Sequence, residues 1–499
     1  MSFAINLPLF SIVACLLSAV VSSVLPGRWA KWLSRLLALA VAVGAAWVLC
    51  RGILTGQTTV YLMGHYPHPW GNELRFGILE PLFAGAFSVV LLLCLVGGSH
   101  ELERDIAPER QNLYYVMADL VLAALLSLCY TNDVFTGYVF IEICTIASCG
   151  LLMIRRIGRT TLAATRYMIF SLVGSGLFLL GVILLYAQTG HLLFPNLREA
   201  VSALWETGSY RFSLLTAVGL MTAGLGIKSG LFPFHFWMPD TYGCATPASA
   251  GILSGLISKG YLFLLLKLVC NVFGAEVFYG GALGDLIFWL GLAGMLLGSV
   301  SAMAEKDAFR MLAFSSAAQI GYVYLGLGLS PTLGVAAALF QILTHALTKP
   351  ALFLSASRLS EAAGGGKTLS ALQGSARADR PAGLLFAVGA LSMIGVPGTM
   401  GFLAKYGFAQ AALAEQGKLL PAILALAVST LLNTCYFGRA ILRLYAKPEQ
   451  PTAFAPERRG RASFLSATGL LCAANLALGL HAQSLLGLLK RGLALMDRT

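Results

Sequence analysis

Fourteen stretches of about 20 mostly apolar residues follow one another along this chain, and about 20 such residues are needed for a helix to cross a bilayer. Only 11% of the 499 residues are charged and 58% are hydrophobic, whereas about 25% of the residues in a soluble domain are charged. The sequence therefore predicts an all-α polytopic membrane protein with about 14 transmembrane helices. The predicted spans are 3–25, 31–50, 78–97, 112–130, 133–154, 164–187, 213–238, 246–271, 283–303, 309–328, 332–356, 382–414, 420–445 and 463–489.

Lysine and arginine are unevenly distributed over the connections between these spans. The odd-numbered connections, with the adjoining span ends, hold 21 of the 34 Lys and Arg residues, whereas the even-numbered connections and the termini hold 8. Cytoplasmic connections carry the excess of basic residues in membrane proteins. We therefore expect a multi-pass protein of a prokaryotic cell membrane, with both termini on the outside. The net charge of +12 then reflects cytoplasmic connections, and no nucleic-acid partner is expected.

Two predicted spans are interrupted by glycine and proline beside a lysine. Span 7 carries Lys228 next to Gly230 and Pro233, and span 12 carries Lys405 after Pro397. Broken backbone at membrane depth is tolerated only where protein or a wet cavity satisfies its polar groups. Because the two spans are five apart, they cross the membrane in opposite directions, which is typical of inverted-repeat transporters. We expect two inverted five-helix repeats with broken helices 7 and 12.

This repeat pattern divides the chain into four segments. We expect an N-terminal three-helix segment, two inverted repeats formed by helices 4–8 and 9–13, and a C-terminal helix 14. Their predicted bounds are 1–111, 112–275, 276–446 and 447–499.

Five lysines and one glutamate lie inside the predicted spans. A charged side chain in the bilayer is costly, usually faces the interior of the bundle, and marks an ion or proton path. Because these residues recur along the whole chain, they predict that the protein moves charge. They are Glu142, Lys228, Lys259, Lys267, Lys349 and Lys405.

Glu142 and Lys228 are natural partners. An unpaired ionised carboxylate is very costly inside a membrane, and a nearby carboxylate favours the charged form of a buried lysine. The pair would titrate as a unit and could hold or release a proton. The alternative is that Glu142 is satisfied by a neighbouring helix and is only structural.

The remaining titratable residues fall into two groups. His345 and Lys349 are four residues apart, on one face of a helix, and with Lys259 and Lys405 they are candidates for a proton relay. Lys267 lies near the outer end of its span, and we expect it to snorkel to the interface.

Two further residues, His235 and Asp240, lie near the cytoplasmic end of broken span 7. We expect them to shape that helix end rather than to carry protons. The ten cysteines include no CxxC pair, and the glycines at 364–366 lack the GK[ST] ending of a phosphate loop. No cofactor is therefore expected on this chain.

Several of these residues lie in segments that resemble the antiporter-like subunit family. This family includes the D-type and A-type subunits of Mrp multisubunit cation/proton antiporters and the three large antiporter-like subunits of respiratory complex I. It also includes their relatives in membrane-bound hydrogenases and formate hydrogenlyases. The segments, which lie between residues 115 and 410, are FIEI, GIKSGLFPFHFWMPDTYGCATPASAGILSGLISKGYL, FSSAAQIGYVYLG, HALTKPALFL and MIGVPGTMGFLAKY.

The resemblance implies a fourteen-helix core with two inverted repeats, and it assigns roles to several residues. Glu142 and Lys228 would form the coupling pair, and Lys259 would be the central relay.

In the second repeat the resemblance implies that His345 and Lys349 bridge the repeats and that Lys405 is the terminal proton site. Two positions depart from the family pattern. Several members have a histidine where this chain has Gln319, which cannot titrate, and some complex I members have a glutamate where it has Lys405.

These observations lead to two competing functions. The first is a proton-translocating subunit, with protons possibly coupled to Na⁺, in a redox-driven pump that is hydrogenase-linked or complex I-like. The alternative is a D-type component of an Mrp Na⁺/H⁺ antiporter without redox chemistry. In both cases the chain itself is a non-catalytic channel. The expected partners are other membrane subunits, both antiporter-like and small helical ones, and in the first case also a hydrogenase or quinone module.

Two further classes fit the sequence less well. A haem or quinone subunit that carries electrons needs paired membrane histidines, and only His235 and His345 are candidates, on distant spans. A free-standing solute carrier needs a pocket for an organic solute, and the sequence shows no sign of one.

Overall fold

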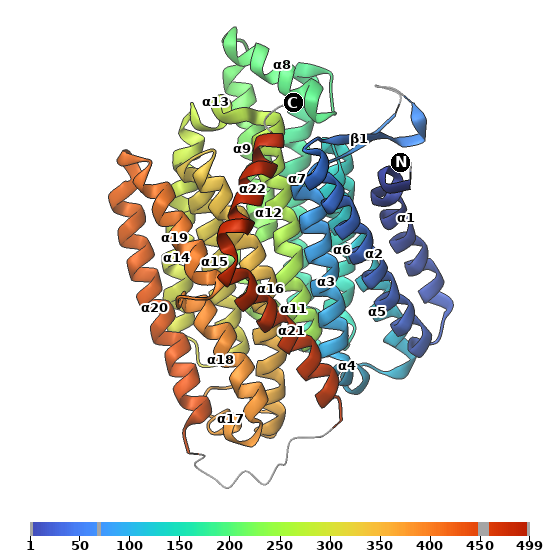
Figure 1. Cartoon of the computed structure of the whole chain (residues 1–499), viewed down its shortest axis with the longest axis vertical. Coiled ribbons are helices and arrows are strands. Elements are labelled where there is room, and N and C mark those ends of the chain that lie inside the picture. Colours follow the sequence, from blue (N-terminus) through green and yellow to red (C-terminus); the bar gives the residue numbers. More distant parts are fainter. Residues whose placement is uncertain (1–2, 67–70, 448–458, 497–499) are drawn as a thin grey trace.

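The computed structural model describes residues 3–66, 71–447 and 459–496, and nearly all of them lie in one bundle of helices (Figure 1). The first helix begins and the last helix ends at the same end of this bundle (Figure 1). The helices are α1 Phe3–Val24, α2 Gly27–Thr55, α3 Leu79–Gly97, α4 Ser99–Asp105, α5 Gln111–Tyr130, α6 Val134–Met153, α7 Gly158–Thr189, α8 Phe194–Glu206, α9 Arg211–Ser229, α10 Trp237–Cys244, α11 Pro247–Ile252, α12 Ser258–Leu268, α13 Gly274–Tyr279, α14 Ala282–Ala304, α15 Ala308–Leu329, α16 Leu333–Ala362, α17 Ser375–Ala378, α18 Arg380–Ile394, α19 Met400–Leu413, α20 Leu419–Tyr445, α21 Arg461–Leu480 and α22 Ala482–Met496.

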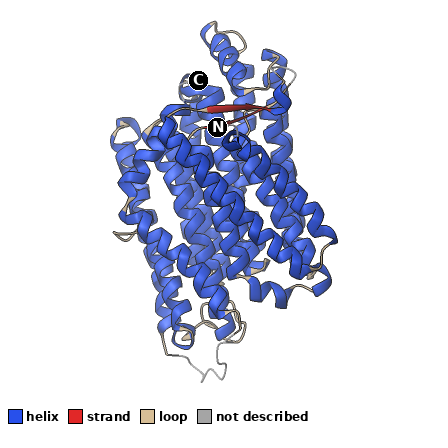
Figure 2. Ribbon diagram, turned by 45° about the vertical axis from the view of Figure 1, so that its right-hand side comes forward, coloured by secondary structure: helices blue, strands red, loops and turns tan. Residues whose placement is uncertain are grey.

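Short irregular elements complete the fold. Strands β1 Thr59–Leu62 and β2 Glu73–Phe76 pair antiparallel and lie across the end of the bundle that holds the termini (Figure 2). Two π-helical segments, Leu253–Ile257 and Val269–Phe273, flank α12. The 3₁₀ turns are Met63–His65, Pro108–Arg110, Phe234–Phe236 and Gln416–Lys418.

The predicted membrane crossings are confirmed. Thirteen helices in the described part of the chain are long and apolar enough to cross a membrane. The remaining crossing is made by α18 and α19, which have 15 and 14 residues and are each too short to span a bilayer alone. The all-helical fold class therefore holds, with a broken helix 12.

Both helix breaks follow a glycine in the left-handed conformation. The helix α9 ends at Ser229 because Gly230 adopts φ 86°, and α18 ends at Ile394 because Gly395 adopts φ 92°. A side chain is rarely tolerated at such φ values. The two broken helices run in opposite directions through the bundle (Figure 1), as inverted repeats require.

The last predicted span is wrong in its extent. Residues 463–489 do not form one helix, because α21 ends at Leu480 and α22 begins at Ala482. The second helix places polar residues such as Lys490 and Arg491 on one side and packs its other side closely on α3, with Gly492 against Leu79.

Glycines allow close contact between helices in the interior. A Cβ at Gly321 in α15 would clash with the backbone nitrogen of Met295 in α14, and a Cβ at Gly224 in α9 would clash with the carbonyl oxygen of Gly174 in α7. Small residues at such contacts let membrane helices pack closely. The most apolar 18-residue stretch of the central helix α16 is entirely buried inside the protein. Charged residues on this stretch are therefore out of reach of lipid and bulk water.

Candidate functional site: a row of buried lysines

Lys228 lies in the last turn of α9, directly before the break. Its ammonium donates a hydrogen bond to Thr145 Oγ1 at 2.7 Å and lies 3.5 Å from Glu142 Oε1. Both partners are on α6. The structure thus brings together the pair that the sequence suggested, although the hydrogen bond goes to the threonine.

The two members of this pair differ in their surroundings. The Lys228 side chain is fully buried, whereas 23% of the Glu142 side chain is exposed on the outer face of the bundle. Glu142 Oε1 itself is buried and has no hydrogen-bond partner among the described residues. The Glu142 side chain therefore reaches the surface of the subunit while its carboxylate faces the buried lysine.

Lys259 follows the π-helical segment at the start of α12. Its ammonium donates to the carbonyl oxygen of Ser254 at 2.5 Å and to Ser258 Oγ at 2.8 Å. Among the described residues no carboxylate lies within ion-pair distance of it. Single-turn π-helical segments are common at functional sites, and here one holds the ligand of a buried lysine.

On α16, Lys349 donates to the carbonyl oxygen of Leu312 in α15 at 2.9 Å. His345, one turn earlier, is buried, and neither ring nitrogen has a partner among the described residues. Gln319 accepts a hydrogen bond from Gln341 at 2.6 Å, while its own amide nitrogen has no described partner. Buried polar atoms without a protein partner are usually satisfied by ordered water, so this segment of the row is suited to hold water.

Lys405 lies on α19, at the second break. It donates to the carbonyl oxygen of Ile394, the last residue of α18, at 2.7 Å and to Thr430 Oγ1 on α20 at 3.0 Å. The C-terminal end of a helix carries a partial negative charge that favours a cation. The broken helix thus supplies a ligand for the ammonium.

Serine hydroxyls connect Lys259 with Lys349. Ser254, whose carbonyl binds Lys259, shares a hydrogen bond of 2.9 Å with the hydroxyl of Ser316 on α15. Ser316 donates to the Leu312 carbonyl at 2.9 Å, which is the same oxygen that binds Lys349. This link joins helices of the two predicted repeats.

A second group of polar side chains runs from Ser315 toward Lys405. The Tyr436 hydroxyl lies 3.0 Å from Ser315 Oγ and 2.8 Å from Asn433 Oδ1. Ser429 precedes Thr430, which binds Lys405, and its hydroxyl lies 3.0 Å from the Tyr322 hydroxyl. The Ser299 hydroxyl lies 3.0 Å from the Ser429 hydroxyl and 3.5 Å from Asn433 Oδ1.

We name both groups together the hydroxyl chain, although one member, Asn433, is an amide and Ser315 and Ser316 are joined only through the backbone of α15. Its residues are Ser254, Ser316, Ser315, Tyr436, Asn433, Ser299, Ser429 and Tyr322. Sequence reasoning did not find them, because serine and tyrosine in an apolar helix have the same pattern as packing residues. Only the meeting of the π-helical segment Leu253–Ile257 with α14, α15 and α20 makes them a set.

The expectation that Lys267 snorkels to the interface is wrong. Only 1% of the residue is exposed, and its ammonium donates to the carbonyl oxygens of Cys129 at 2.7 Å and Thr131 at 2.6 Å. These carbonyls belong to the end of α5, where a helix leaves its last carbonyls without intrahelical partners. They hold the ammonium inside the protein.

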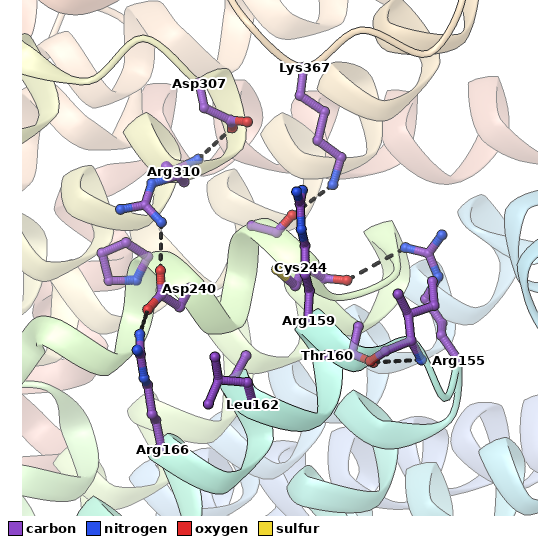
Figure 3. A pocket seen from close by; sticks show the side chains of 14 residues that line it. Arg155, Arg159, Thr160, Leu162, Arg166, Asp240, Cys244, Asp307, Arg310 and Lys367 are labelled. Atoms are coloured by element: carbon purple, nitrogen blue, oxygen red, sulfur yellow. Dashed lines mark hydrogen bonds and ion pairs between the residues drawn. The ribbon is translucent and has the colours of Figure 1, made fainter.

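His235 and Asp240 lie at the far end of broken helix 7. His235 is packed between the rings of Phe232 and Phe236. Asp240 pairs with Arg166 on α7 and with Arg310 on α15, at 2.5 Å from the latter (Figure 3). These contacts fasten α10 to two neighbouring helices.

The amino-acid sequence is similar to membrane subunits of known complexes. A family model described as NADH:quinone oxidoreductase/Mrp antiporter, TM, matches residues 131–432. The N subunit of the NADH-quinone oxidoreductase of Desulforudis audaxviator (strain MP104C) is 34% identical over 413 residues, which are 82% of this chain and 80% of the relative.

Two further similarities lie on the antiporter side. The D subunit of the Na(+)/H(+) antiporter of Alkalihalophilus pseudofirmus is 28% identical over 374 residues, covering 75% of this chain and 73% of the relative. A chain in the structure of the Mrp complex from Dietzia sp. DQ12-45-1b has the same fold, with a TM-score of 0.88 at 24% identity. That match covers 100% of this chain and 98% of the other.

Proposed function

Because this chain belongs to the NADH:quinone oxidoreductase/Mrp antiporter family of membrane subunits, we propose that it conducts protons through the membrane as one subunit of a larger complex. It is a multi-pass, antiporter-like subunit. The single observation that carries the proposal is the row of buried lysines. Polar contacts connect Lys259 to Lys349, and a separate group of polar side chains runs from Ser315 toward Lys405. Packing alone gives no reason for so many buried ammonium groups, because each is costly.

The route has three parts. Protons enter through a wet half-path near broken helix 7 and load Lys228 or Lys259. They then cross the bundle along Lys349, the hydroxyl chain and water held near His345. They leave through a second half-path near Lys405, which lies partly buried next to the second break.

The driving step is electrostatic. When Glu142 moves toward the outer face and a basic group of a neighbouring subunit, Lys228 loses its counter-charge. Its ammonium is then less stable in its buried site, and a proton advances along the row. Two observations support this step: 23% of the Glu142 side chain is exposed, and its Oε1 is held by a long ion pair of 3.5 Å without a hydrogen bond.

Two kinds of complex use such a subunit. The relative with 34% identity is named as part of an NADH-quinone oxidoreductase, which favours a redox-driven pump of the complex I or hydrogenase type. The relative named as part of a Na(+)/H(+) antiporter favours the alternative, an Mrp-type Na⁺/H⁺ antiporter.

Transport by the purified native complex in proteoliposomes tests both proposals. Lumen acidification driven by reduced ferredoxin, formate or NADH, and lost in Lys228→Ala, would establish the redox pump. Proton movement driven by a sodium gradient, insensitive to these donors and lost in Lys228→Ala, would establish the antiporter. Full coupled transport in Lys228→Ala would refute proton conduction through this row.

The orientation and the absence of a cofactor are part of the proposal. We place both termini outside, because the connections at the opposite end of the bundle carry the excess of Lys and Arg. We also propose that this chain binds no cofactor of its own. In support, no group of three or more His, Cys, Asp and Glu among its described residues is placed to hold a metal ion.

A further inference from the structure

A cavity of about 530 Å³ opens at the end of the bundle opposite the termini. It lies between the beginning of α7, the helix α10 and the beginning of α15, and Lys367 reaches it from the connection after α16 (Figure 3). It does not contain any lysine of the buried row. What it binds is therefore a question separate from proton conduction.

The walls of this cavity carry more positive than negative charge. Five cationic side chains line it, from Arg155, Arg159, Arg166, Arg310 and Lys367, against two carboxylates. Both carboxylates are already engaged. Asp240 pairs with Arg166 and Arg310, and Asp307 accepts hydrogen bonds from the backbone amides of Phe309 and Arg310.

Two cations, Arg159 and Lys367, have no ion-pair partner among the described residues, and a third, Arg155, has only a long ion pair. Arg159 is exposed and has no carboxylate within ion-pair distance among the described residues. Lys367 donates only to a carbonyl oxygen, that of Gly243, at 2.7 Å. Arg155 lies 3.4 Å from Asp105 and donates to the Cys244 carbonyl at 3.5 Å, but its Nε is buried without any partner in the described chain.

The backbone at the cavity also favours an anion. The helix α7 begins here at Gly158, and its first turn contains no acidic residue. The first amides of a helix have no intrahelical acceptor and form an anion-binding end. In α7 the Thr160 amide donates to the Ile157 carbonyl at 2.9 Å, so the amides of Gly158 and Arg159 form this end. The planar guanidinium group of arginine can donate two parallel hydrogen bonds to the oxygens of one phosphate group. The cavity is therefore built for a phosphate group.

Apolar surface next to the cavity indicates the source of that phosphate. Leu162 lines the cavity and is 55% exposed, and Ile157 on its rim is 46% exposed. The helix α7 has 32 residues, so it is about 48 Å long, which exceeds the hydrocarbon thickness of about 30 Å. Its first turns thus reach the headgroup layer, where basic pockets between helices bind anionic lipids.

The geometry points to a binding site for the phosphate of an anionic phospholipid, with Arg155, Arg159 and Lys367 around the headgroup and the acyl chains along the exposed face of α7. A free phosphate ion would use the same cations but would have no use for the apolar rim. This inference does not rest on the proposed proton path.

Lipid binding to the purified, delipidated complex tests the site. Native mass spectrometry would count phosphatidylglycerol molecules bound to the wild type, to Arg159→Gln and to a matched control, Arg156→Gln. Arg156 is the neighbouring exposed arginine and does not line the cavity. We expect Arg159→Gln to weaken phosphatidylglycerol binding about tenfold, the loss of one charge-assisted contact, and Arg156→Gln to leave it unchanged.

Competition with inorganic phosphate separates the two sources. Phosphatidylglycerol that stays bound in excess phosphate, and that phosphatidylcholine does not replace, supports the lipid site. Displacement by phosphate, together with phosphate binding that Arg159→Gln weakens, would overturn the lipid assignment in favour of a free anion. Equal phosphatidylglycerol binding by the wild type and both variants would overturn the site itself.

Discussion

Neutralising Glu142 should uncouple transport without preventing assembly. The Glu142 carboxylate lies 3.5 Å from the Lys228 ammonium, and at an effective dielectric constant of about 20 such a pair is worth about 5 kcal/mol. Because the glutamine amide oxygen and Thr145 Oγ1 can still accept hydrogen bonds from the ammonium, we expect Glu142→Gln to remove about half of this value, about 2–3 kcal/mol of stabilisation. At about 1.4 kcal/mol per factor of ten, coupled transport should fall by about 30- to 100-fold.

The assay is donor- or sodium-driven proton movement in proteoliposomes, at equal amounts of assembled complex. Two controls isolate the charge. Thr145→Val removes the hydrogen bond to Lys228 but keeps the carboxylate, and it should cost much less. Asp285→Asn breaks an ion pair with Lys418 at the surface, where the Asp285 side chain is 64% exposed, and it should have no effect. Transport by Glu142→Gln at the wild-type rate would refute the electrostatic step.

Three further predictions follow from the hydroxyl chain, a buried carboxyl and a helix contact. Tyr436→Phe removes the hydroxyl between Ser315 and Asn433 and should slow proton transport about tenfold, the cost of about one hydrogen bond. The control Tyr406→Phe changes an exposed tyrosine and should not slow transport. Equal transport rates for Tyr436→Phe and the wild type would exclude this route. Burial, with a smaller contribution from Glu361, raises the pKa of Glu101 to about 7, so the folded protein binds this proton more tightly and loses stability as the pH rises from about 4.5 to 7. Glu101→Gln should therefore raise the free energy of unfolding at pH 8, by an amount on the order of 1–3 kcal/mol, but not near pH 4. The control is Glu109→Gln, at an exposed glutamate. A gain in stability of Glu101→Gln that is the same at both pH values would contradict the raised pKa. Gly321→Ala forces a Cβ into the backbone of α14 and should destabilise the protein by about 2 kcal/mol or more. The control Gly176→Ala on α7 places a Cβ where no atom lies within 4 Å and should not destabilise it. Thermal unfolding in detergent measures both variants, and equal unfolding midpoints would show that α14 and α15 can move apart at no cost.

Apolar length and Gly/Pro position were enough to predict most of the fold. Spans of about 20 residues have few alternatives in lipid, and Gly230 and Gly395 break their helices because both adopt positive φ. The pairing of Glu142 with Lys228 was also predictable, since a buried charge needs a partner. The division of the last span at His481 was not, because α22 still contains enough leucine to continue an apolar pattern.

The parts of the site that could not be predicted are those whose chemistry resides in the main chain or in common side chains. Lys267 looked like an interfacial residue because nothing in its own span reveals the free carbonyls of Cys129 and Thr131, which come from α5. The hydroxyl chain needs four helices to meet, and no local pattern encodes that meeting.

The ligands of the buried ammonium groups have a consequence for how this row can change in evolution. Lys259, Lys267, Lys349 and Lys405 each bind a carbonyl oxygen of the main chain. A substitution at Leu312 or Ile394 changes the packing of a side chain but leaves the main-chain carbonyl that binds the lysine in the sequence. Fixed carbonyl oxygens of the main chain thus take the place of the water molecules that would bind these ammonium groups in solution. Relatives could retain the same ligand geometry even where the residues that provide it share no identity.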